Sequence, residues 1–504
     1  MTRESPPCIL VIFGATGDLT ARKLLPALYN LHRDNLLSAE CICVGVARKA
    51  KSHKAFRLEQ KKAISAHSRS GYVKNTIWKK FASRLFYYRA EFSDKEAYIS
   101  LHAFLNAIDE KFGTRGNRIY YLSTQPQYFS IIVKNLHDNH MLSKQGDPWS
   151  RVVIEKPFGH DLDSSQQLQK ELAKYLDEKQ IYRVDHYLGK ETVKNIPAYR
   201  FANITRDSLW NYQYIDSVQI TIAEDIGIGT RGNFFEGEGL LRDMIQNHIM
   251  QLLSLVAMEP PKDFSAQAIQ EAKIEALQSI RLTEKDVVRG QYGSGCINGK
   301  KISGYREEKN VDPHSYIETY VAMKLFIDTP RWKGVPFYLR GGKRLPRRIA
   351  EITVIFKPGK YPELNKRTNY WSIRIQPNEA FFDTLLIKTP VVQNDSWQFV
   401  CLEHCFKSTK KNLQSSELPE AYENLFLQCM SGDHSLFASE NEVMASWKIL
   451  TPILKSWERN PPDFPNYAAG SWGPEAALKL IEDDGRHWIC LLYTSDAADE
   501  RSSV

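Results

Sequence analysis

The sequence is poor in cysteine and has no long apolar run. Its eight cysteines include no Cys-x-x-Cys pair, and the closest spacings, Cys41 with Cys43 and Cys401 with Cys405, have no matching Cys or His pair nearby. We therefore expect neither a disulfide scaffold nor a structural zinc site, and no metal at all. No apolar stretch reaches the length that spans a bilayer, and the N-terminal MTRESPPCIL lacks the layout of a signal peptide. The sequence thus predicts a reduced, cytoplasmic protein without membrane contact.

The composition that remains is ordinary for a globular enzyme. Of the 504 residues, 42% are hydrophobic and 25% are charged, and the length suggests two or three domains. The net charge of +8 raises nucleic acid as an alternative partner. However, Lys and Arg are spread along the chain among acidic residues, without a nucleic-acid-binding motif. The charge balance therefore favours a phosphorylated small molecule and no nucleic acid.

A glycine turn near the N-terminus has the form of a dinucleotide cradle. The apolar run 8–13 predicts a strand, GATGDLT follows at 14–20, and a second strand is expected over 42–47 after an amphipathic helix. Gly14 and Gly17 allow a tight turn and a close approach of phosphate to backbone amides at a helix N-terminus. The third glycine of the usual fingerprint is absent, so an ordinary strand-to-helix turn is the alternative interpretation.

Two basic residues, Arg48 and Lys49, follow the second predicted strand. NAD-binding units usually place an acidic residue here for the ribose hydroxyls. A basic pair in that place favours a 2′-phosphate and hence NADP. The alternative is a solvated strand end, where basic residues are common.

The spacing of apolar residues divides the chain into two architectures. Strand and helix candidates alternate in the first part, which predicts an α/β Rossmann-like domain with a parallel sheet over residues 1–195. Strands of alternating polarity with helices between them predict an α+β domain with a large, mainly antiparallel sheet over residues 196–488. The segments on which this rests are helices 95–112, 163–180 and 239–256 and strands 118–124, 151–159, 217–224, 320–328, 351–357, 372–377 and 384–390.

Two short segments concentrate ionisable groups. YRVDHYLGKE at 182–191 contains Asp185 and His186, and the predicted helix 239–256 places His248 between apolar neighbours. From these residues alone, His248 could be a hydrogen-bonded core histidine and Asp185 a helix cap.

Four motifs in a fixed order resolve these alternatives, because together they resemble the glucose-6-phosphate dehydrogenase family. The DHYLGKE segment is far more specific than any glycine turn. The resemblance covers about residues 8 to 488. The motifs are GATGDLTARKLLPAL at 14–28, EKPFG at 155–159, RVDHYLGKE at 183–191 and RDMIQNH at 242–248, supported by PFYLRGGKRLP at 336–346 and AYENLFLQCMSGD at 421–433.

The resemblance implies oxidation of D-glucose 6-phosphate to 6-phospho-D-glucono-1,5-lactone, with hydride transfer to NADP, as the first step of the oxidative pentose phosphate pathway. It implies that His248 is the general base and that Asp185 orients it. It also implies that phosphate is bound by His186, Tyr187 and Lys190. The further substrate positions are Lys156, Glu224, Asp243, Lys343 and Arg348, and the cofactor positions are Gly14, Thr16, Gly17, Asp18, Leu19, Lys23, Arg48 and Lys156.

The resemblance also sets expectations beyond the site. It implies a homodimer or homotetramer formed through the large sheet, and a hinge at Pro157. The chain departs from the family at Ala21, Gly341 and Arg348. Residues 489–504 have no core-forming periodicity, and we expect an artefactual or disordered tail there.

Two rival functions fit parts of the same pattern. Another sugar oxidoreductase with a Rossmann unit and an EKP motif would need no phosphate site. A non-catalytic NADP sensor would keep the glycine cradle and bind the cofactor without turnover. The presence of both Asp185 and His248 argues against the sensor.

Overall fold

A computed structural model describes residues 5–143, 146, 148–361, 368–388, 397–405 and 418–489. The chain forms two compact units that interleave along the sequence. The described part of the chain contains no helix long and apolar enough to cross a membrane. Except for Ile489, the predicted tail lies outside the described residues. The first unit takes its described residues from Met1–Ala198, Gln246–Gln278 and Phe406–Pro452, and the second from Tyr199–Ile245, Ser279–Cys405 and Ile453–Val504.

The first unit is built on a seven-stranded sheet in the order β19-β6-β5-β4-β1-β2-β3. All neighbouring strands are parallel except β19, which pairs antiparallel with β6. Because β1 lies between β2 and β4, the strand order reverses at β1, where a doubly wound sheet binds its ligand. The strands are β1 Cys8–Phe13, β2 Cys41–Ala47, β3 Leu85–Arg89, β4 Arg118–Leu122, β5 Ser150–Ile154, β6 Ile181–Val184 and β19 Phe437–Ala438.

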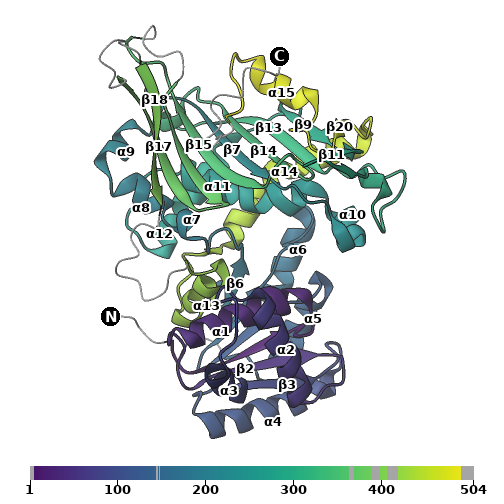
Figure 1. The fold of residues 1–504 in the computed structure, drawn as a ribbon. Helices are drawn as coiled ribbons and strands as arrows, with labels where there is room; N and C mark the ends of the chain where they lie inside the picture. Colours follow the sequence, from purple (N-terminus) through teal and green to yellow (C-terminus); the bar gives the residue numbers. More distant parts are fainter. Residues whose placement is uncertain are drawn as a thin grey trace. The chain divides into compact units, whose positions relative to one another are not determined.

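Helices join these parallel strands, as the alternating pattern predicts (Figure 1). The expected helix 95–112 forms as α4, which Asp94 caps by accepting from the Glu96 amide and which ends at Gly113, whose φ is +71°. The helices are α1 Leu25–Arg33, α2 His53–His67, α3 Asn75–Ser83, α4 Lys95–Phe112, α5 Phe129–Asp138, α6 Leu162–Ala173, α7 Glu191–Lys194, α11 Met250–Ala257, α12 Ala266–Gln278 and α13 Ala421–Ser431, with α8 Ile196–Phe201 and α14 Glu440–Arg459 continuing into the second unit.

Two elements of this unit are shorter than the sequence pattern indicates. The strand expected over 151–159 ends at Ile154, so that EKPFG is a loop containing the cis peptide between Lys156 and Pro157. Proline has no N–H to give to a sheet, which is the reason the strand cannot continue through Pro157. The helix expected over 163–180 ends at Ala173.

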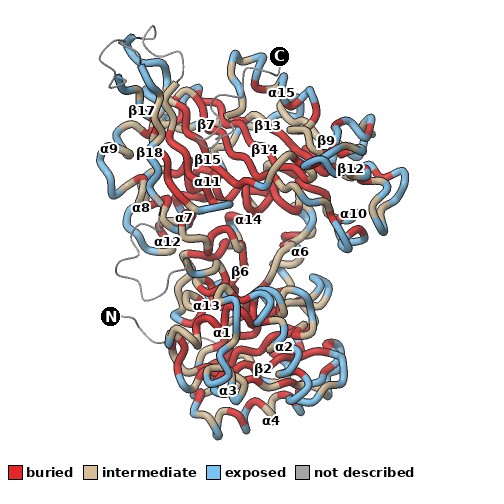
Figure 2. Tube along the Cα trace, in the orientation of Figure 1, coloured by how far each residue is buried: buried red, intermediate tan, exposed pale blue. Residues whose placement is uncertain are grey.

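The second unit contains a nine-stranded sheet in the order β18-β17-β16-β15-β7-β14-β13-β8, with β9 also paired to β13. The pairing of β7 with β14 is parallel and the other neighbours are antiparallel. Its central strands β7, β14 and β15 are buried (Figure 2). The strands are β7 Ile215–Ala223, β8 Ile280–Arg281, β9 Val287–Gly290, β13 Tyr320–Ile327, β14 Phe337–Gly342, β15 Ile349–Phe356, β16 Tyr370–Gln376, β17 Ala380–Lys388 and β18 Trp397–Cys405.

The described part of this unit also contains two smaller sheets and the α-helices α9, α10 and α15. Strand β10 pairs with β20, and β11 pairs with β12. Together with the large sheet, these elements confirm the predicted α/β and α+β fold classes. The elements are α9 Ile204–Leu209, α10 Gly232–Leu240, α15 Glu475–Glu482, β10 Tyr292–Gly293, β11 Gly295–Ile297, β12 Lys300–Ile302 and β20 Tyr467–Ala468.

The helix expected over 239–256 begins two residues later than the pattern predicts. Gly239 has a φ of +67°, and a Cβ there would lie 2.4 Å from the Glu318 carboxylate. The same carboxylate accepts from the Leu241 amide at 2.9 Å. The helix therefore starts at Leu241, runs as a π-helix to Ile249 and continues as α11. π-Helical segments often occur at functional sites, and this one carries His248.

Candidate active site

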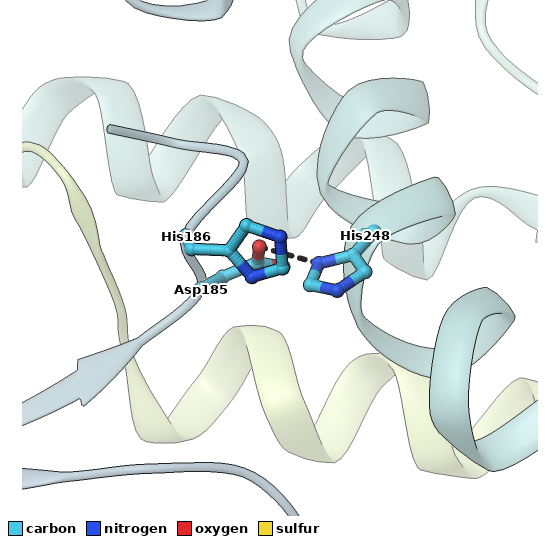
Figure 3. Close-up of side chains that lie close together, drawn as sticks. All are labelled: Asp185, His186 and His248. Atoms are coloured by element: carbon cyan, nitrogen blue, oxygen red, sulfur yellow. Dashed lines mark hydrogen bonds and ion pairs between the residues drawn. The ribbon is translucent and has the colours of Figure 1, made fainter. Parts of the chain in front are cut away.

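A buried aspartate and histidine form the centre of the candidate site in the first unit. Asp185 directly follows β6, and His248 lies in the π-helical segment that precedes α11. Oδ1 of Asp185 lies 2.6 Å from Nδ1 of His248, and the two side chains are 2% and 1% exposed (Figure 3). With the Nδ1 proton donated to the carboxylate, Nε2 carries the lone pair and can accept a proton.

The surroundings of Asp185 keep its carboxylate charged. Oδ1 also accepts from the backbone N–H of Tyr187 at 2.9 Å. Burial by itself would raise the pKa of Asp185, but the charge and hydrogen bond of His248 outweigh burial, and the pKa falls from 3.8 to about 2. Oδ2 is buried and has no hydrogen-bond partner among the residues that the structure describes. An anion at this position can stabilise an imidazolium on His248.

Lys156 approaches the other nitrogen of the same ring. Its Nζ lies 3.2 Å from Nε2 of His248. Strands β5 and β6 are parallel neighbours, with Ile154 opposite Arg183, so the residues that follow both strands meet at one edge of the sheet. This register explains why EKPFG and RVDHYLGKE, which are separate in sequence, contribute to one site.

The loop between β6 and α7 gathers the predicted phosphate-binding residues. The His186 and Tyr187 rings lie 4.5 and 4.4 Å from the His248 ring, measured between centroids. Nζ of Lys190 lies 5.5 Å from the Tyr187 ring centroid. Burial, followed by the charges of His248, Lys156 and Lys190, holds the pKa of His186 well below its usual range, although Asp185 opposes the shift. A phosphate dianion would add a negative charge beside these groups and favour protonation of His186.

Asp185, His186 and His248 are also spaced closely enough to bind a metal ion. One ligand atom from each lies within 4.8 Å of the others. Asp185 already uses Oδ1 on Nδ1 of His248, and Lys156 adds a positive group next to Nε2. The hydrogen-bonded geometry and the neighbouring lysine favour proton transfer over cation binding.

Three residues that sequence reasoning missed lie beside this centre. Oε1 of Glu155 accepts from the Tyr121 hydroxyl at 2.5 Å and from the Tyr422 hydroxyl at 3.1 Å. Burial raises the pKa of Glu155 from 4.5 to about 7, and Asp185 adds to the rise, while the tyrosines and Lys156 oppose it. Glu155 stands in the EKPFG motif, but nothing in the sequence indicates that tyrosines 34 and 267 residues away bind it.

The second unit contains a separate charged cluster around Lys343. Its Nζ lies 2.6 Å from Oε2 of Glu224 and 3.6 Å from Oδ2 of Asp243, and its side chain is 1% exposed. Parallel pairing of β7 with β14 brings Glu224 next to Lys343, because each residue directly follows its strand. The cluster offers a donor between two acceptors, which suits recognition of sugar hydroxyls. Arg348 is exposed and makes no hydrogen bond or ion pair within the described ranges.

The glycine turn after β1 is tightly packed against the neighbouring strands. Gly14 has a φ of +86°, and a Cβ there would lie 1.9 Å from the Ser123 carbonyl oxygen. The amides of Gly14 and Ala15 both donate to the Val46 carbonyl oxygen, at 2.9 and 3.2 Å. Glycine is therefore required at position 14, because the Ser123 carbonyl oxygen occupies the place of a Cβ.

The other predicted cofactor residues surround this turn. Gly17 and Asp18 are exposed, Thr16 and Leu19 are partly buried, and Asp18 forms an exposed ion pair with Arg22 at 2.7 Å. Arg48 is exposed two residues beyond Val46. Lys23 instead pairs with Glu420 at 3.0 Å, so it would have to leave this partner to contact a cofactor.

Comparison with protein families matches almost the whole chain. The model for the NAD binding domain of glucose-6-phosphate dehydrogenase matches residues 11–195, and the model for its C-terminal domain matches residues 197–489. A glucose-6-phosphate 1-dehydrogenase from Chlamydia muridarum is 50% identical over 495 residues, covering 96% of this chain and 97% of that protein. Its counterpart from Bacillus subtilis is 39% identical over 498 residues, covering 97% of this chain and 99% of that protein.

Solved structures agree with this result. A glucose-6-phosphate dehydrogenase in complex with its substrate glucose-6-phosphate superposes with a TM-score of 0.88 at 32% identity, covering 97% of this chain and 100% of the other. The glucose-6-phosphate 1-dehydrogenase from Mycobacterium avium has a TM-score of 0.82 at 35% identity, covering 97% and 99%. These matches confirm the predicted family, the oxidoreductase class and the presence of a dinucleotide-binding domain.

Proposed function

The chain belongs to the glucose-6-phosphate dehydrogenase family, and from that premise we propose that His248 is the general base that removes the C1 hydroxyl proton of glucose 6-phosphate. The observation that carries this proposal is the buried contact of 2.6 Å between Asp185 and Nδ1 of His248. It selects the tautomer in which Nε2 accepts the proton. The product is the 6-phospho-lactone, as expected for the first step of the oxidative pentose phosphate pathway.

The reaction removes a hydride from C1 of the sugar and a proton from the C1 hydroxyl. When bound, the oxidised nicotinamide ring accepts the hydride with both electrons of the C1–H bond. Nε2 of His248 takes the hydroxyl proton, and the C1–O bond becomes the lactone carbonyl. Asp185 remains ionised and stabilises the imidazolium that forms.

We assign substrate recognition to two groups of residues. His186, Tyr187 and Lys190 provide donors for the phosphate, and Lys156 lies close to Nε2 of His248, where the C1 hydroxyl must arrive. In the other unit, the cluster around Lys343 supplies donors and acceptors for sugar hydroxyls. This second group consists of Glu224, Asp243 and Lys343, and the family resemblance adds Arg348, an exposed basic residue.

We propose that NADP is the cofactor. The tight turn at Gly14 connects β1 to a helix at the carboxyl edge of the parallel sheet, which is where a dinucleotide phosphate binds in this fold. Arg48 is an exposed basic residue directly after β2, the strand whose Val46 carbonyl oxygen accepts from this turn, and its charge suits a 2′-phosphate. Replacement of Arg48 by Ala is expected to raise KM for NADP about tenfold and leave KM for NAD unchanged. The matched control is Lys54→Ala, and equal effects on both cofactors would contradict the assignment.

The remaining expectations are proposals of the same kind. We propose a division near residue 195 between a cofactor domain and a substrate domain, a cytoplasmic location, and a homodimer or homotetramer formed through the large sheet. Sedimentation of the full chain tests the assembly, and a monomer at working concentration would contradict it.

The deciding experiment follows the reduction of NADP with glucose 6-phosphate or glucose. The wild type should turn over the phosphorylated sugar, and His248→Asn should lose about 10³–10⁴-fold in kcat while still binding both ligands. His67→Asn, on the exposed end of α2, is the matched control. Equal turnover of glucose would favour the other sugar oxidoreductase, and NADP binding without turnover would favour the sensor.

A further inference from the structure

Glu155 is a carboxylate at the candidate site that the proposed mechanism does not use. It directly follows β5, and its Oε1 accepts from the hydroxyls of Tyr121 and Tyr422 at 2.5 and 3.1 Å. Tyr121 is at the end of β4, and Tyr422 is in the first turn of α13. Three elements of one unit therefore converge on this carboxyl group.

Four groups with titratable or charged atoms face Glu155. Tyr121 and Tyr422 are the two donors, Lys156 is its neighbour in the loop, and Asp185 interacts with it from the end of the adjacent strand β6. Burial raises the pKa of both tyrosines well above the usual range, so both stay protonated and keep donating. The tyrosines therefore hold Glu155 in place in either of its charge states.

Proton transfer to His248 adds a positive charge beside Lys156, with which Glu155 interacts. Proton uptake creates an imidazolium on His248 within 3.2 Å of the Lys156 ammonium. Asp185 compensates one of these two positive charges. With Glu155 protonated, the two cations would be compensated by Asp185 and the substrate phosphate alone. With Glu155 ionised, the two cations face two carboxylates.

We infer that Glu155 is a positioning residue whose carboxylate, held by Tyr121 and Tyr422, compensates the charge of Lys156 while His248 carries the substrate proton. This inference rests on the proposed function, because it presumes His248 as the base. Burial and Asp185 raise the pKa of Glu155 to about 7. The group therefore changes charge within the working range of pH, and turnover should rise as it ionises.

The test compares kcat against pH for the wild type, Glu155→Gln and Tyr422→Phe. Near pH 6 the wild type carries a neutral Glu155, so Glu155→Gln should match it within about twofold; near pH 8.5 the variant should be about tenfold slower. Tyr422→Phe removes one donor to the carboxylate. The increase of kcat with pH should therefore occur up to about one pH unit higher, and kcat at high pH should stay unchanged. Glu110→Gln, exposed on α4, is the matched control.

A second readout does not depend on activity. Infrared difference spectra of the unliganded protein should show carboxyl groups titrating near neutral pH. Glu155→Gln should lose one of these signals, while the signal of Glu351, whose pKa burial also raises to about 7, should remain. Tyr422→Phe should shift the Glu155 signal to higher pH. Titration of this group below about pH 5 would overturn the inference even if the protein proved inactive. A rate defect of equal size at every pH would also overturn it, because it would show a merely structural role. An inactive wild type with the neutral titration would contradict the proposed function and, with it, this role for Glu155.

Discussion

The carboxyl ends of β5 and β6 present two carboxylates in neighbouring positions with opposite behaviour. Asp185, after β6, has a pKa of about 2, whereas Glu155, after β5, has a pKa of about 7. Burial acts in the same direction on both groups, since it disfavours the charged form. The difference therefore comes from their partners and not from their depth.

The hydrogen-bond partner of Asp185 can become a cation, whereas the hydrogen-bond partners of Glu155 stay neutral. His248 bonds Oδ1 of Asp185 and supplies a positive charge, which outweighs desolvation. Tyr121 and Tyr422 supply hydrogen bonds without charge, which reduce the effect of desolvation on Glu155 but do not overcome it. One sheet edge thus holds a permanent anion next to a switchable one.

Among the variants that test this contrast, Asp185→Asn should have the largest effect. An amide can hold His248 in the other tautomer and cannot stabilise the imidazolium, so kcat should fall about 10³–10⁴-fold at every pH. Steady-state kinetics with glucose 6-phosphate, with Glu110→Gln as the control, checks this. If Glu155→Gln cost as much as Asp185→Asn at low pH, the two carboxylates would not differ in role.

A smaller effect is expected from Lys156→Met, which removes the cation that lies next to His248 and interacts with Glu155. Loss of the ammonium near Nε2 of His248 should lower kcat/KM on the order of a hundredfold, because substrate positioning is lost. In the Lys156→Met variant, adding Glu155→Gln should cause no further loss of kcat at high pH, since no lysine charge remains to be compensated. Double-variant kinetics measure this coupling, with Lys170→Met on the exposed face of α6 as the control. Additive effects of the two changes would separate Glu155 from Lys156.

The smallest effect concerns stability. The lowered pKa of Asp185 contributes stability that is present above its ordinary 3.8 and lost as pH falls through about 2. The raised pKa of Glu155 contributes stability that is present below its ordinary 4.5 and lost as pH rises through about 7. The free energy of unfolding of Glu155→Gln, relative to that of the wild type, should therefore rise by about 1–3 kcal/mol between about pH 5 and pH 8. Thermal unfolding followed by circular dichroism at both pH values checks this, and a difference that does not change with pH would contradict the shift of Glu155.

Much of the fold could be predicted from local patterns. The apolar run at β1 and the capped helix α4 have their expected bounds, because strand burial, an N-cap and a C-terminal glycine are local signals. The expectation for 151–159 was too long, because the apolar run ends at Ile154 and Pro157 cannot pair in the sheet. The start of the His248 helix depended on Glu318, about 80 residues away, which no local pattern reports.

For the candidate site, too, some features could be predicted from the sequence and others depend on the tertiary structure. By itself, the sequence determined the family, the two fold classes and the residue types His248, Asp185 and Lys156, because their motifs are short and contiguous. Tertiary structure alone decided that Glu155 meets Tyr121 and Tyr422, that Lys343 lies between Glu224 and Asp243, and that Arg348 stays exposed. The physical reason is that desolvation and charge act through space. The pKa of a carboxylate follows from the groups that parallel strands and a distant helix bring around it, which its sequence neighbours do not specify.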